Sequence, residues 1–279
     1  MIRRTSPRVL PGFSLSLGVT LLFVSLILLL PMTSLVGQLS TLSWPQYWAA
    51  ITDPRMIASY RVTLLAALVA SLVNALFGLL MAWVLARYTF PGKRVLDALM
   101  DLPFALPTAV AGITLATLYS QNGAVGSLLA PLGIEIAYTW VGIALAMAFT
   151  SVPFVVRTVQ PVLEDLPAQA DEAALTLGAS NFYAFRRVIF PHIWPAVVTG
   201  TGLSFARSLG EFGAVIFIAG NMPYRTEVVS LMMATRLEEY DYAGAAAIAS
   251  LVMLVSLVLL LAINLWQGRF YRRLHGGRH

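Results

Sequence analysis

The chain alternates long apolar segments with shorter polar ones over nearly its whole length. A membrane-spanning helix needs about 20 mainly apolar residues, and six segments come close to that length. Their approximate bounds are 13–36, 62–85, 102–119, 138–156, 193–218 and 243–266. The pattern predicts an all-α polytopic membrane protein with six transmembrane helices, which form a single membrane domain over residues 1–279. The first segment is 24 residues long, whereas the apolar part of a signal peptide has about 7–15, so we expect it to be retained as a helix.

The third segment is the least regular of the six, because it is short and contains Pro103, Pro107 and Gly112. Proline removes a helical hydrogen bond, and the freed carbonyl must then be satisfied by neighbouring protein or by water in a cavity. We therefore expect this span to be packed inside the protein and to be kinked or broken. Asp101 stands at its cytoplasmic entrance, so the segment is a candidate lining of a translocation path.

Composition and charge agree with this interpretation and add an orientation. The chain is 58% hydrophobic and 11% charged, whereas soluble domains carry about 25% charged residues. Thirteen of the eighteen lysines and arginines fall in segments on the side of the two termini, and four fall in the opposite loops. Because these residues concentrate in cytoplasmic loops, both termini are predicted to be cytoplasmic. The net charge of +5 is then a property of these loops, and no nucleic-acid partner is expected.

Several kinds of chemistry lack a motif in the sequence. There is no cysteine, and the three histidines are scattered, so we expect no metal site. A P-loop needs a second Gly followed by Lys and Ser or Thr. Lys93 is the only lysine, but Arg94 follows it and Arg87 stands where the first Gly is needed. With no nucleophile–base pair either, we expect no catalytic residues and no cofactor in this chain. If transport is driven by ATP, a partner chain must bind ATP and Mg²⁺.

The longest loop on the predicted cytoplasmic side, about 157–191, contains DEAALTLGASNFYAFRRVIFP. Its first part favours a helix with acidic residues in the first turn, and Gly178 is expected to end it. A second, amphipathic helix should follow, with Phe182, Phe185 and Ile189 on one face. One interpretation is a helix resting on lipid headgroups.

The same loop resembles the cytoplasmic coupling loop of ABC importer permeases, in which E-A-A, Gly and a closing aliphatic-x-aliphatic-Pro recur at this spacing. Val188 and Phe190 are variants, since the family more often has Ile and Leu there. The resemblance implies a coupling helix that docks on a cytoplasmic ATPase. The residues that it assigns to ATPase coupling are Asp171, Glu172, Ala173, Ala174, Gly178, Ala179, Phe185, Val188, Phe190 and Pro191.

The resemblance extends to most of the chain. Segments such as LMDLPFALPTAVAG and FARSLGEFGAVIFIAGNMP look like the sulfate/thiosulfate permeases of the T-subunit type, and the molybdate permeases are close. This resemblance implies the type I ABC importer permease fold in a bacterial plasma (inner) membrane. It also implies a homologous second permease subunit, two ATPase subunits and a periplasmic sulfate-binding protein. A molybdate/tungstate permease and a self-sufficient secondary anion transporter or channel remain alternatives, and a membrane enzyme has little support.

Two charges, Arg207 and Glu211, interrupt the fifth apolar segment. Four residues apart on a helix, they should share one face, opposite a bulky stripe that includes Phe205 and Leu209. Charge is costly in lipid, so this face should contact protein or a water-filled path. The two interpretations are an ion pair that fixes packing or gating, and direct contact with a translocated anion. The candidate path or gate residues are Arg207, Glu211, Ser204, Ser208, Asp101, Pro103, Pro107 and Thr108.

Overall fold

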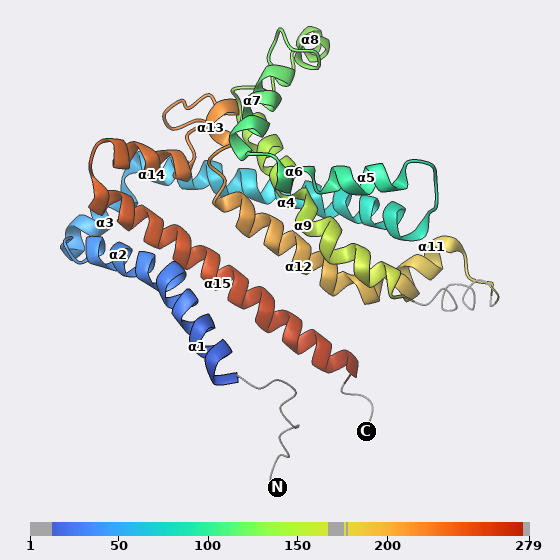
Figure 1. Cartoon of the computed structure of the whole chain (residues 1–279). Helices are drawn as coiled ribbons and strands as arrows, with labels where there is room; N and C mark the ends of the chain where they lie inside the picture. Colours follow the sequence, from blue (N-terminus) through green and yellow to red (C-terminus); the bar gives the residue numbers. More distant parts are fainter. Residues whose placement is uncertain (1–12, 167–175, 177, 276–279) are drawn as a thin grey trace.

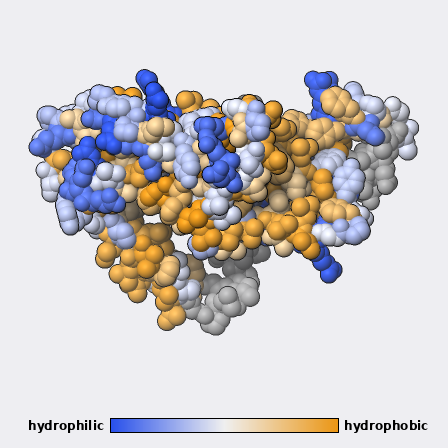
Figure 2. Space-filling view, turned by 90° about the horizontal axis from the view of Figure 1, so that it is seen from above, coloured by the Kyte–Doolittle hydropathy of each residue, from blue (hydrophilic) through white to orange (hydrophobic). Residues whose placement is uncertain are grey.

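The computed structural model describes residues 13–166, 176 and 178–275, and every regular element in these ranges is a helix (Figure 1). Five helical stretches are long and apolar enough to cross a membrane: 13–39, 54–87, 140–164, 181–209 and 242–263. Thr108–Tyr119 is a shorter apolar helix. The structure is therefore an all-helical membrane protein with five to six candidate spans. Apolar side chains cover much of one face of it (Figure 2).

The first span consists of α1 (Phe13–Val24), the π-helical turn η1 (Ser25–Leu29) and α2 (Leu30–Leu39). None of the most apolar window of this span is buried. Of its three described parts, α2 is the one that packs closely on the last helix, α15 (Tyr242–His275). An apolar helix with so little protein around it needs lipid or another chain to cover it. α1 begins and α15 ends on the same side of the molecule (Figure 1); that this side is cytoplasmic stays a prediction.

Three long helices form the core: α4 (Pro54–Arg87), α9 (Trp140–Glu164) and α12 (Phe190–Leu209). They meet at small residues. A Cβ added to Gly78 of α4 would lie 2.8 Å from the Val155 side chain, and one added to Gly200 of α12 would lie 2.8 Å from the Val155 Cα atom. Glycine at these positions lets the backbones approach closely, as in many membrane helix pairs.

The third predicted span is broken in the structure. α5 (Lys93–Met100) and the short α6 (Leu102–Ala105) precede the break, and α7 (Thr108–Tyr119) follows it. At the break, Leu106 and Pro107 have extended backbone, with ψ angles of 135° and 129°. A residue before proline is disfavoured in the α region, which explains why the helix stops at this point.

The fifth predicted span, 193–218, is not one helix, and this corrects the sequence-based prediction. At its start, α11 (Asn181–Ala184) and the π-helical turn η3 (Phe185–Ile189) run directly into α12. At its end, α12 stops at Leu209, and the chain turns before the short α13 (Val215–Ile218). Leu209, which belongs to the predicted bulky stripe, is 4% exposed and lies in the core, and Phe205 packs against the same core.

The amphipathic face expected from Phe182, Phe185 and Ile189 is only partly correct. Phe182 is 72% exposed, whereas Ile189 is 4% exposed and Phe185 is half-buried. The π-helical turn inserts an extra residue per turn, so the buried side runs from Ala184 to Ile189 instead. The prediction assumed an unbroken 3.6-residue period.

The remaining elements lie at the opposite end of the core from α11. They include α3 (Trp44–Thr52), α8 (Gly126–Leu129), the 3₁₀ turn η2 (Ala130–Leu132) and α14 (Val229–Glu238). α3 begins with a capping box between Ser43 and Gln46. Trp44, which is 72% exposed, stacks on Tyr47 and Trp48.

Candidate translocation site and coupling segment

The two helix breaks lie against each other. The first turns of α7 pack on the turn between α12 and α13 (Figure 1). A Cβ added to Gly112 would lie 2.7 Å from the Ala214 Cα atom, and one added to Gly213 would lie 3.0 Å from the Thr108 Cβ atom. Irregular backbone at membrane depth occurs where it is buried in protein or lines a cavity. This contact is therefore the first candidate for a translocation site.

Arg207 and Glu211 flank the same turn. Arg207 lies in the last turn of α12, and its NH1 is 2.7 Å from Glu211 Oε2. The other carboxylate oxygen accepts from the Ala214 N–H at 3.0 Å, and the Glu211 carbonyl accepts from the Ser230 hydroxyl at 2.8 Å. The side chain of Glu211 is 1% exposed and that of Arg207 35%. Glu211 thus holds the turn together, while its partner remains accessible.

The hydroxyls of Ser204 and Ser208 lie in a closed polar network. Asn74 of α4 donates to Ser151 Oγ at 2.9 Å, to Ser204 Oγ at 3.1 Å and to the Ala148 carbonyl at 3.0 Å. Ser204 and Ser208 both bond to Ser151, at 2.9 and 3.2 Å. All four polar side chains are at most 2% exposed. The network joins α4, α9 and α12, so in this structure the two hydroxyls face helix contacts and no open path.

The other predicted path residues are divided between core and surface. Pro103 is buried, Pro107 is exposed at the break, and Thr108 is half-buried beside Gly213. Asp101 accepts two hydrogen bonds from Arg157 of α9, at 2.8 and 2.7 Å. Sequence reasoning missed this pairing, because the partners are 56 residues apart and no period links them.

The described part of the coupling segment packs firmly on the core. Asp171, Glu172, Ala173 and Ala174 lie outside the described residues. Gly178 has a φ of +85°, a conformation that favours glycine, and Ala179 is half-buried. Phe185 meets Trp83 of α4 edge-on, with ring centroids 5.4 Å apart.

A buried cluster at the end of α4 and α9 receives this segment. Phe185 and Phe190 pack against it, Val188 is half-buried, and Pro191 lies in the first turn of α12. The members of the cluster include Leu85, Leu163, Ile189 and Ile193. Motion of α11 and η3 should therefore be transmitted to the ends of both core helices.

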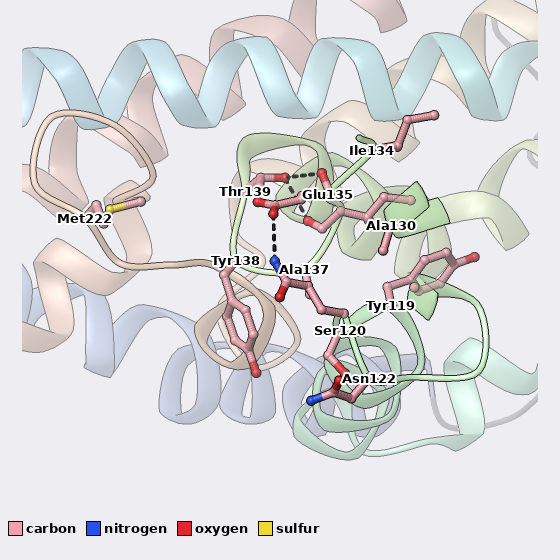
Figure 3. A pocket seen from close by; sticks show the side chains of 13 residues that line it. Tyr119, Ser120, Asn122, Ala130, Ile134, Glu135, Ala137, Tyr138, Thr139 and Met222 are labelled. Carbon is pink, nitrogen blue, oxygen red and sulfur yellow. Dashed lines mark hydrogen bonds between the residues drawn. The ribbon is translucent and has the colours of Figure 1, made fainter. Parts of the chain in front are cut away.

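A cavity of about 450 Å³ lies at the other end of the molecule, between the end of α7 and the start of α9 (Figure 3). Its wall includes Tyr119, Asn122 and Thr139. Gln121 donates to Glu135 at 2.7 Å, and the N–H of Tyr138 donates to the Ile218 carbonyl at 2.8 Å. The second bond ties the wall of the cavity to the end of α13. Among the described residues there is no cluster of His, Asp and Glu that could hold a metal ion.

A helical membrane domain in which two interrupted spans meet, with a coupling-type segment packed at one end, has the organisation of a membrane permease. Residues 74–276 match the family described as "Binding-protein-dependent transport system inner membrane component". The chain belongs to this family. It is therefore an inner membrane component of such a transporter and not itself an ATPase, and membership implies a binding protein and an ATPase as partners.

The chain is similar over its length to proteins named "Sulfate transport system permease protein CysT". It is 62% identical to that of Salmonella typhimurium over 276 residues, which cover 99% of this chain and 100% of the relative. Identity to the Escherichia coli protein is also 62%, with the same coverage. Identity to the Synechocystis protein is 49% over 255 residues, which cover 91% and 89% of the two chains.

Solved structures support the fold. A chain of a bacterial ABC transporter that imports the acidic polysaccharide alginate aligns with a TM-score of 0.75 at 18% identity, covering 91% of this chain and 94% of that one. A chain of the MetNI methionine ABC transporter, in an inward-facing conformation, aligns with a TM-score of 0.56 at 17% identity, covering 83% of this chain and 99% of that one. At these identities the likeness shows the ABC importer permease fold alone.

Proposed function

We propose that this chain is the permease subunit of an ATP-driven importer of sulfate and thiosulfate. The observation that carries the proposal of an anion path is the contact between the two helix breaks, beside the accessible guanidinium of Arg207. Discontinuous membrane helices with their N-terminal ends turned toward a site are typical of places where transporters hold anionic groups. The choice of sulfate is supported by relatives of that name that are 62% identical over nearly the whole chain.

The proposed path passes the first turn of α7, Thr108 and Arg207. The N-terminal end of a helix carries partial positive charge and unpaired N–H groups, and neutral donors of this kind can hold a divalent anion. Glu211 neutralises much of the charge of Arg207, so the anion is held weakly and can leave again. Pro103 and Pro107 allow the broken span to flex as the path opens. Ser204, Ser208 and Asp101 contribute by fixing the neighbouring helices.

The proposed mechanism is alternating access. A periplasmic binding protein delivers the anion to the outer face, where the cavity between α7 and α9 lies. The cytoplasmic loop at about 157–191 couples to the ATPase through its residues from Asp171 to Pro191. Because α11 and η3 pack on the ends of α4 and α9, displacement of the loop would tilt the core helices and change access to the helix breaks.

The proposed assembly contains this chain, a homologous second permease subunit as its heterodimer partner, and two cytoplasmic ATPase subunits. ATP and Mg²⁺ bind to the ATPase subunits. In a bacterial plasma membrane both termini would be cytoplasmic, with six spans in the type I arrangement. In this arrangement α6 and α7 form the third span despite the break.

Uptake by cells that lack their own sulfate and molybdate permeases tests the substrate. The chain is expressed with its partner subunits, and uptake of labelled sulfate and molybdate is measured. We expect sulfate uptake that thiosulfate competes with. Rescue of molybdate uptake alone would overturn the sulfate proposal.

Coupling is tested by replacing Gly178 with leucine. Gly133 is a matched control: it also has a positive φ, +70° against +85°, and open space around its Cα. We expect Gly178→Leu to abolish ATPase association or uptake, and Gly133→Leu to preserve both. If Gly178→Leu leaves both intact, the chain is not coupled through this loop, and a self-sufficient transporter becomes the better account.

A further inference from the structure

We propose that Arg157 is a positioning residue that fastens the base of the interrupted third span to the helix entering the coupling loop. In this account α5, α6 and the cytoplasmic end of α9 move as one unit when the ATPase displaces the loop. The inference rests on the proposed function, because it concerns how motion of the loop reaches the anion path.

The guanidinium of Arg157 is fully occupied by groups from two parts of the chain. Nε donates to Asp101 Oδ1 at 2.8 Å, and NH2 donates to Asp101 Oδ2 at 2.7 Å. NH1 donates to Asp97 Oδ1 at 2.6 Å and to Gln160 Oε1 at 2.9 Å, and NH2 also reaches the Asp97 carbonyl at 2.9 Å. The five N–H donors of the guanidinium are thus matched by five acceptors. Among the side chains, only arginine provides five donors in this fixed geometry.

The network continues toward the coupling loop. Gln160 donates its amide to Glu164 Oε1 at 2.9 Å. Glu164 is the last residue of α9, so the hydrogen-bonded side chains reach the point where the helix leads into the loop. The positions of Asp97 and Asp101 are therefore tied to the last two turns of α9.

On its other side, the network leads to the anion path. Asp101 directly precedes α6, and four residues of helix separate it from the break at Leu106 and Pro107. Beyond the break, α7 packs on the turn that Glu211 holds. The contacts thus form a continuous physical chain from the end of α9 to the helix breaks, and packed side chains and hydrogen-bond networks of this kind can carry coupling between distant sites.

Exposure indicates that this network orients the helices more than it stabilises the fold. The side chains of Arg157, Asp97 and Asp101 are 32%, 40% and 50% exposed. A single ion pair this exposed contributes little to stability because water screens it, and the bidentate geometry and the shared network add to that modest value. A bidentate arginine–carboxylate pair still fixes direction strongly. Loss of the network should therefore leave a folded complex that couples poorly.

The test compares Arg157→Gln and Arg157→Lys in the purified complex with its partner subunits, reconstituted in lipid. We expect normal assembly and ATP hydrolysis, with sulfate uptake per ATP hydrolysed reduced by about tenfold in Arg157→Gln, as coupling networks of this kind allow. Arg157→Lys keeps the positive charge but not the planar guanidinium. Its sulfate uptake per ATP hydrolysed should therefore lie between those of the wild type and Arg157→Gln. Arg236→Gln is the matched control, because its 3.1 Å pair with Asp241 is similarly exposed, at 32% and 37%, but lies far from the loop.

A second measurement does not depend on the substrate. The chain has no cysteine, so single cysteines at the exposed positions Val95 on α5 and Asp165 after α9 can carry spin labels. We expect one narrow distance distribution with and without ATP, and a broadened, ATP-dependent one in Arg157→Gln. The inference would be overturned if Arg157→Gln changed neither the distance between the labels nor the sulfate uptake per ATP hydrolysed. It would also be overturned if the Arg157→Gln complex failed to assemble while the Arg157→Lys complex behaved like the wild type. A further outcome is that the complex with Arg157 intact takes up no sulfate, while the substitution Arg157→Gln still broadens the distance between the two spin labels as expected. In that case the proposed function fails and the positioning role of Arg157 stands.

Discussion

Arg207 and Glu211 form one ion pair at 2.7 Å but lie in different surroundings: the arginine side chain is 35% exposed and the glutamate side chain 1%. A buried charge without its partner is strongly destabilising, whereas a charge that can reach water is not. The two members of the pair are therefore not equivalent, although the sequence presents them as symmetrical.

The first prediction follows from this asymmetry. Arg207→Gln leaves a buried carboxylate unpaired and should destabilise the complex by about 3–5 kcal/mol. Glu211→Gln leaves a partly exposed arginine, and its new amide can still accept from the Ala214 N–H, so the loss should be smaller. The double variant should recover part of the loss of Arg207→Gln. Thermal unfolding of the purified complex measures all three.

The control for these variants is Arg225→Gln, because Arg225 lies exposed in the loop after α13. It should unfold at the wild-type temperature. No recovery in the double variant, together with altered anion preference in Arg207→Gln alone, would instead favour direct contact between Arg207 and the anion.

The second prediction concerns the contact between the two helix breaks. In Gly112→Ala the new methyl group would lie 2.7 Å from the Ala214 Cα atom, so α7 must move away from the turn. Overpacking of this kind lowers the free energy of unfolding by about 1–3 kcal/mol. We expect the complex to remain folded while its sulfate uptake falls. Gly18→Ala, where nothing lies within 4 Å of the new atom, should behave like the wild type. Normal uptake by Gly112→Ala would argue against a path at the helix breaks.

The third prediction concerns the polar network in the core. Asn74→Ala removes three hydrogen bonds between helices and should lower stability by about 0.6–2 kcal/mol. Ser71→Ala is its control, because within the described part of the chain the Ser71 hydroxyl bonds only to the Leu68 carbonyl of its own helix. Thermal unfolding of the complex again provides the measurement.

A fourth prediction separates packing from anion contact at Ser204. Because its hydroxyl is fully buried in the same network, Ser204→Ala should lower stability and leave the ratio of sulfate to thiosulfate uptake unchanged. Competition uptake assays measure this ratio. A changed ratio at unchanged stability would show that the hydroxyl faces the anion in another conformation.

Local features of the sequence were enough to predict part of this arrangement. Proline acts on its own backbone and on the residue before it, so the break at Leu106 and Pro107 could be expected from Pro107 alone. The i, i+4 spacing of Arg207 and Glu211 likewise predicted that they would meet. Both features depend on the few residues around them.

Other features depend on contacts between distant segments. Gly210 alone does not end a helix, and α12 stops there because Glu211 bonds to the turn and α14, while α7 packs on its far side. The pairing of Arg157 with Asp97 and Asp101 spans 56 to 60 residues. No periodicity in one sequence can predict either, since each forms only once the helices have packed.

Sulfate uptake by the purified complex in proteoliposomes, with the loaded binding protein outside and ATP supplied to the ATPase subunits, tests most directly whether this chain serves an ATP-driven sulfate importer. We expect labelled sulfate to accumulate only with hydrolysable ATP, and unlabelled sulfate and thiosulfate to compete with it, whereas molybdate does not. Accumulation without ATP, or accumulation of molybdate in preference to sulfate, would contradict it.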